Sequence, residues 1–123
     1  MNETPAQQLR TRVRTDLRTA MKVRDTAAVA ALRSALAGID NAEAVAPTEM
    51  SVAAVSEHVA GAGVGVGSTE SARLVLSVDD VQSVLHTLIT ELSAEAGRYD
   101  GYGQADAAQR LRSEAAALSH YVD

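Results

Sequence analysis

The sequence predicts an all-α fold: a four-helix, bundle-like arrangement of two helical hairpins, with a Gly-rich connector between the second and third helices. Three observations predict this fold. Alanine, the residue with the highest helix propensity, supplies 24 of the 123 residues. Phe and Trp are absent and Tyr occurs three times, so the aromatic residues that favour strands are scarce. Leu and Val recur at steps of three and four residues in several segments, the spacing of helices buried along one face.

The first hairpin is expected over residues 5–45. Thr4 fits an N-cap, Pro5 the first helical position and Gln7 the end of a capping box, so the first helix should span residues 5–24. Asp25 is the expected N-cap of a second helix, which spans residues 26–45 and is closed by Pro47. The apolar faces are Leu9, Val13, Leu17, Ala20 and Met21 in the first helix, and Val29, Leu32, Leu36 and Ile39 in the second.

The second hairpin is expected over residues 78–122. Ser77 and Asp80 fit a capping box for a third helix, which should reach about residue 102 and stop at Gly103. A fourth helix is expected over residues 105–122. Residues 46–76 are predicted to be an irregular connector, because four glycines in residues 61–67 destabilise helix and strand alike. Residues 1–123 should form a single domain.

Charge is divided unevenly along the chain. Residues 1–33 hold seven basic and three acidic residues, whereas residues 34–123 hold four basic and thirteen acidic ones. Cations at helical spacing can contact phosphates, which gives affinity for nucleic acid without reading the bases. The candidate nucleic-acid-binding residues are Arg10, Arg14, Arg18 and Lys22, at steps of four, together with Arg33. The alternative is that they pair with the acidic third helix or remain solvated.

No other motif predicts a catalytic, cofactor or metal site. The glycines of residues 61–67 do not follow the G-x-G-x-x-G spacing, and the chain's single lysine, Lys22, is not in a phosphate-binding loop. Cys is absent, and His58, His86 and His120 are not spaced as metal ligands. No segment has the roughly 20 apolar residues that span a bilayer, and no signal-peptide pattern is evident. We therefore expect a cytoplasmic protein with no membrane partner.

Four short segments resemble the GatB/YqeY family. They are Met21–Asp25; Leu32 and Arg33 with Leu36, Ile39 and Asn41–Glu43; Leu76–Val81; and Gly103–Asp106 with Leu111, Glu114, Leu118, Tyr121 and Val122. They follow the family's order and cover the chain apart from residues 46–76. The resemblance implies the helical N-terminal domain of a YqeY-like protein, whose smaller tail domain would begin where this chain stops, at Asp123. The connector is longer and richer in Gly than the link usual in the family.

The resemblance also implies a relation to tRNA charging, because the family's tail domain is similar to the tail of the GatB subunit of glutamine-dependent aminoacyl-tRNA amidotransferases, which helps to engage tRNA. The leading hypothesis is a non-catalytic module that binds tRNA, or a protein of the tRNA-charging machinery, through the five basic residues. A second hypothesis is a protein–protein or self-association module without nucleic acid. A third is a carbon–nitrogen ligase with glutamine as amido-nitrogen donor, an activity often ascribed to the family. The resemblance supplies no catalytic residue, and we expect no cofactor.

Overall fold

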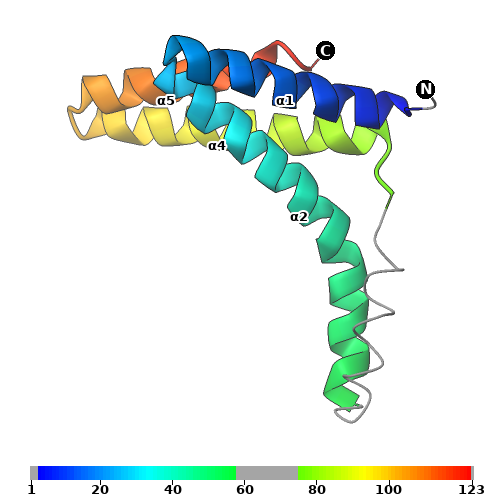
Figure 1. Cartoon of the computed structure of the whole chain (residues 1–123). Helices are drawn as coiled ribbons and strands as arrows, with labels where there is room; N and C mark the ends of the chain where they lie inside the picture. Colours follow the sequence, from blue (N-terminus) through cyan, green and yellow to red (C-terminus); the bar gives the residue numbers. More distant parts are fainter. Residues whose placement is uncertain (1–2, 58–74, 123) are drawn as a thin grey trace.

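Within residues 3–57 and 75–122, the computed structural model of the chain contains four helices, which confirms the predicted fold class (Figure 1). It describes the backbone of residues 3–57 and 75–122, and the side chains of the same ranges apart from residues 45–57. The helices are α1 (Pro5–Val23), α2 (Thr26–Glu57), α4 (Val78–Gly101) and α5 (Ala105–Ser119). No strand occurs in these described ranges. Consecutive helices pair as two hairpins, α1 with α2 and α4 with α5, and α2 crosses the second hairpin.

The predicted helix starts are confirmed at the level of single hydrogen bonds. The Thr4 hydroxyl accepts from the Gln7 amide at 3.1 Å, and the Gln7 side chain accepts from the Thr4 amide at 2.8 Å. Ser77 and Asp80 form the same reciprocal pair at the start of α4, at 3.1 and 2.9 Å. The Asp25 carboxylate accepts from the amide of Ala28 at 3.1 Å, as expected of the N-cap of α2. These bonds satisfy amides that a helix start leaves without an intrahelical partner.

The predicted end of the second helix is wrong. Helix α2 continues through Pro47 to Glu57, so residues 46–57 of the expected irregular connector are helical. Proline has no amide hydrogen for the helical ladder and typically costs about 3 kcal/mol in a helix interior. The alanines at positions 42, 44 and 46 before Pro47 and at positions 53 and 54 after it favour the helix and oppose this cost. Residues 58–74 of the predicted connector, which include the Gly-rich residues 61–67, lie outside the described residues.

The core combines a few large aliphatic side chains with many alanines. Ile39, Leu85, Leu118, Val13 and Val81 are the largest fully buried side chains. Four helices nevertheless approach closely, because alanine occupies the contact positions between them: Ala6, Ala20, Ala31, Ala35, Ala96, Ala108 and Ala115 are buried. Short side chains let helix axes come nearer than rows of leucine would.

Glycine extends this close approach between α2 and α4. A Cβ atom built on Gly38 would lie 2.9 Å from Cγ1 of Val84 and 3.6 Å from Cδ1 of Leu88. The first distance is shorter than van der Waals contact, so this point of α2 has room for glycine alone unless a neighbour moves.

Two details at the helix ends differ from the sequence expectation. Met21, expected on the apolar face of the first helix, is 49% exposed, whereas its neighbour Ala20 is buried. Helix α5 ends at Ser119 instead of residue 122, and the following residues bring Tyr121 back against α1. Among the described helices, none has both the length and the apolar composition that crossing a membrane requires.

Candidate nucleic-acid interface

The basic residues of α1 turn from the α2 side of the helix to its outer surface. An α-helix turns by about 100° per residue, so each step of four residues shifts a side chain by about 40°. Measured from the buried Val13, Arg10 is therefore about 60° away and Lys22 about 180° away. Arg14 and Arg18 lie between these two limits, and both are exposed. The four cations form a shallow spiral and not a single straight stripe.

Arg10 differs from the other candidates because it is held within the bundle. Its guanidinium lies 2.8 Å from a carboxylate oxygen of Glu43 and 3.6 Å from one of Asp40, both on α2. The Arg10 side chain is 20% exposed. Its charge is balanced and partly covered, so the structure assigns Arg10 to the contact between α1 and α2 more than to the outer surface.

Arg33 extends the cationic surface from α1 onto α2. It is exposed and lies seven residues before Asp40, which places both on the same side of α2. Asp40 meets α1 through Arg10, so Arg33 is also on the α1 side of α2. Because the two helices run in opposite directions from a short turn, Arg33 stands at about the level of Arg18. We call the exposed set Arg14, Arg18, Lys22 and Arg33 the basic face.

The basic face is not neutralised by the acidic third helix. Helix α1 holds five basic residues and one acidic residue, whereas α4 holds one basic and five acidic ones. Within residues 3–44 and 75–122, however, no ion pair joins α1 to α4: Arg98 of α4 pairs with Glu95 of the same helix, and Arg112 of α5 pairs with Asp100. In the same ranges no ion pair involves a member of the basic face.

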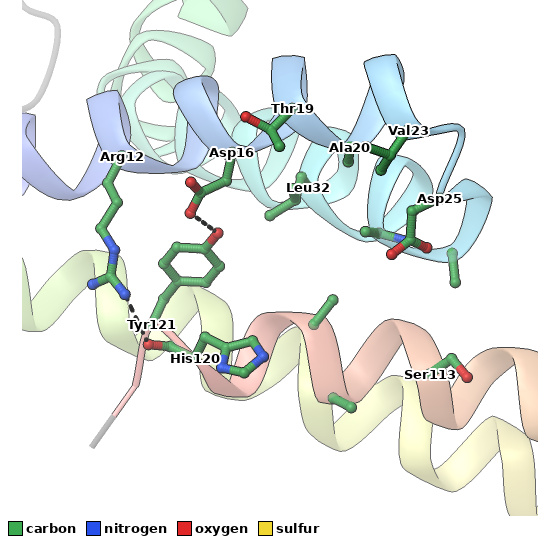
Figure 2. A pocket seen from close by; sticks show the side chains of 14 residues that line it. Arg12, Asp16, Thr19, Ala20, Val23, Asp25, Leu32, Ser113, His120 and Tyr121 are labelled. Atoms are coloured by element: carbon green, nitrogen blue, oxygen red, sulfur yellow. Dashed lines mark hydrogen bonds between the residues drawn. The ribbon is translucent and has the colours of Figure 1, made fainter.

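A cleft of about 720 Å³ lies on the other flank of α1, between this helix and α5 (Figure 2). One end is closed by Tyr121, whose hydroxyl donates to a carboxylate oxygen of Asp16 at 2.5 Å. The guanidinium of Arg12 lies 4.9 Å from the centre of the Tyr121 ring and donates to the backbone carbonyl of His120 at 3.4 Å. Burial raises the pKa of the Tyr121 phenol above its ordinary value, and the hydrogen bond to Asp16 raises it further.

The remainder of the cleft is mostly apolar and is made of small side chains. Its lining includes Ala20 and Val23 from α1, Ala27, Ala28 and Leu32 from α2, and Ala116 and Ala117 from α5. Val23 is 69% exposed. The hydrogen-bonded groups at the closed end fasten the C-terminal residues to α1.

Sequence reasoning did not find the Arg12, Asp16 and Tyr121 cluster. Arg12 and Asp16 are four residues apart on α1, a spacing that placed them on one side of the helix, about opposite the basic face. No local pattern connects them with Tyr121, which is 105 residues from Asp16 in sequence. This contact depends on the return of the chain after α5.

The other residues considered for chemistry do not come together in the described part of the chain. His86 and His120 are both exposed, on α4 and after α5, and His58 lies outside the described residues. Within the part of the chain that the structure describes, no three His, Cys, Asp or Glu side chains form a group suited to a metal ion. Burial raises the pKa of Glu114 on α5, and the nearby Glu95 adds to this effect while Arg110 opposes it.

Comparisons of the chain with models of protein families, with curated proteins and with solved structures found no match.

Proposed function

We propose that this protein is a non-catalytic module that binds structured RNA, with tRNA as the first RNA to test, through contacts of the basic face with phosphates. The observation that carries the proposal is the exposure of Arg14, Arg18, Lys22 and Arg33 on adjacent surfaces of α1 and α2, with no ion pair to any of them within the described side chains. Cations that are not neutralised internally are available to phosphate, and release of the condensed counterions favours binding.

The acidic overall charge does not oppose this proposal, because charge is segregated. The chain carries a formal net charge of −5, but the acidic residues of α4 are not interleaved with the basic face. Exposed cations gathered on adjacent surfaces of α1 and α2 can steer a polyanion to that side even when the net charge is negative. The resemblance to the GatB/YqeY family supports tRNA as the RNA to test first.

The test is fluorescence anisotropy with labelled tRNA at several salt concentrations. Four phosphate contacts predict a slope of log K against log salt of about −3.6, so binding should weaken by about 100-fold between about 50 and 200 mM salt. Arg18→Glu should weaken binding by about tenfold and reduce the magnitude of the slope by about 1.

Arg110→Glu is the matched control, because Arg110 is an exposed arginine on α5, outside the basic face. It makes the same change of charge and should leave the affinity within about twofold. A signal that does not depend on salt, or equal effects of the two variants, would contradict the proposal.

The cleft between α1 and α5 favours a second candidate function, that of a protein–protein or self-association module. Its alanine-lined walls and the exposed Val23 would let a partner helix pack closely. Sedimentation velocity tests self-association, and pull-down with Val23→Asp as the comparison tests a partner. This function would be contradicted if the protein sediments as a monomer and if no protein is captured whose binding is lost in Val23→Asp. The ligase alternative remains an expectation of the family resemblance, and turnover by the purified protein with glutamine as donor is its test.

A further inference from the structure

The basic face also indicates which form of nucleic acid it suits. This inference rests on the proposed function. We infer that the basic face binds the backbone of a double helix and not a single strand, and that it does so without preference for base sequence. Three features carry this inference: the residue types on the face, the length over which its charges are spread, and its position outside the cleft.

The residue types provide no aromatic ring for base stacking at this face. Binding of single strands generally uses aromatic side chains on which unpaired bases stack. Phe and Trp are absent from the chain, and α1 and α2 contain no tyrosine. Tyr121 is buried and hydrogen-bonded to Asp16, and Tyr99 and Tyr102 lie at the turn between α4 and α5, where their rings contact each other edge to face. The basic face therefore offers charge and hydrogen-bond donors but no ring.

The charge spacing suits a dense row of phosphates. Arg14 and Lys22 are eight residues apart, about 12 Å along α1, and Arg33 lies beside them on α2. A duplex carries one phosphate charge per about 1.7 Å of its axis, so about seven phosphates lie within the same length. Over this length the four cations therefore meet a higher density of phosphate charge on a duplex than on a single strand. A single strand has a lower charge density and releases fewer counterions for each contact.

The position of the basic face on the surface also favours binding of a double helix. The basic face extends over exposed surfaces of α1 and α2, and the cleft on the other flank of α1, which contains Asp16 and Asp25, carries no member of the face. Proteins that bind single strands without sequence preference usually enclose the strand in a basic groove. Four cations on the exposed surfaces of two helices, outside the cleft, can lie against a rigid duplex but do not enclose a flexible strand.

The experiment compares the full chain's affinity for two labelled probes of equal length: an RNA duplex of about 16 bp and a uridine single strand of about 16 nucleotides, which has no internal pairing. We expect the duplex to bind at least tenfold more tightly at about 50 mM salt, with a slope near −3.6. Two duplexes of unrelated sequence should bind within about twofold of each other. Arg18→Glu should reduce duplex affinity about tenfold, and Arg110→Glu should not.

The possible failures are distinguishable. If the single strand binds as tightly as the duplex, or if the two duplexes differ by more than about tenfold, the inference about the double helix is overturned while the proposed RNA-binding function stands. If neither probe nor tRNA binds, the proposed function itself is wrong, and the inference fails with it.

Discussion

Replacing Gly38 or Gly97 by alanine tests how closely α2 and α4 pack, because only Gly38 faces the other helix at close range. Alanine favours a helix interior over glycine by about 1 kcal/mol, so Gly→Ala should stabilise wherever the new methyl group has room. At Gly97, in α4, no atom lies within 4 Å of the position a Cβ would take, and Gly97→Ala should gain about this amount. At Gly38 the same methyl group would lie 2.9 Å from Cγ1 of Val84. Valine is restricted to one main rotamer in a helix, so its methyl group cannot turn away easily.

Overpacking of this kind costs about 1 to 3 kcal/mol, which exceeds the gain in helix propensity. Gly38→Ala should therefore lower the free energy of unfolding by about 1 kcal/mol, and the two variants should differ by about 2 kcal/mol. Urea denaturation measures both values, and thermal unfolding should show midpoints moving in opposite directions by about 4 °C each. In a Val84→Ala background, Gly38→Ala should no longer destabilise. If Gly38→Ala stabilises the unmodified protein as much as Gly97→Ala does, the reasoning from the helix contact is refuted.

Three further predictions concern side chains on α1 and α5. Tyr121→Phe removes a hydrogen bond to an ionised, part-buried carboxylate and should lower the free energy of unfolding by about 1.5 kcal/mol in urea denaturation; an unchanged midpoint would mean that this bond is not formed in solution. Arg10→Met should cost about 1 kcal/mol in the same assay, because it removes the guanidinium that contacts Asp40 and Glu43 across the α1–α2 contact, and a gain in stability would contradict this account. The folded-state pKa of Glu114 is raised, so its contribution to stability is greatest at low pH and is lost as pH rises through that pKa. Glu114→Gln should therefore stabilise the protein at about pH 7 and have no effect at about pH 3, and an equal effect at both values would be inconsistent with the raised pKa.

Local chemistry was enough to predict most of the framework. The caps at Thr4, Asp25 and Ser77 involve residues three apart in sequence, and each hydrogen bond is present in the structure. The positive φ of Gly103, 75°, likewise follows from a position where only glycine is unstrained. The fold class follows from these starts and stops together with the helical spacing of Leu and Val.

Two features required knowledge of how the helices pack. Pro47 was predicted to end α2 because proline is unfavourable in a helix interior, but α2 continues through it to Glu57. Alanines such as Ala31 and Ala35 were not predicted as core residues, although both are buried. Alanine occurs on buried and exposed helix faces alike, so its position in a helical pattern does not indicate burial until the partner helix is known.

The candidate site was predicted in part. Steps of four residues correctly placed Arg14, Arg18 and Lys22 on exposed parts of α1, but the same pattern grouped them with Arg10. A helix repeats every 3.6 residues, so a series at steps of four drifts around the axis, and the first member of this series faces α2. The partner of Arg10 could not be predicted, because Glu43 lies on a different helix, 33 residues further along the chain.

The separation of charge between α1 and α4 has a practical consequence for handling the protein. A protein with a sequence pI of about 5.1 would normally be expected to pass through a cation-exchange column at neutral pH. Here one side can adsorb to a sulfonated resin while another adsorbs to a quaternary amine resin, so retention depends on which side meets the matrix. Both kinds of retention should fall as the Debye length shortens with added salt, and elution from the cation exchanger is the simplest sign that α1 presents its charges outward.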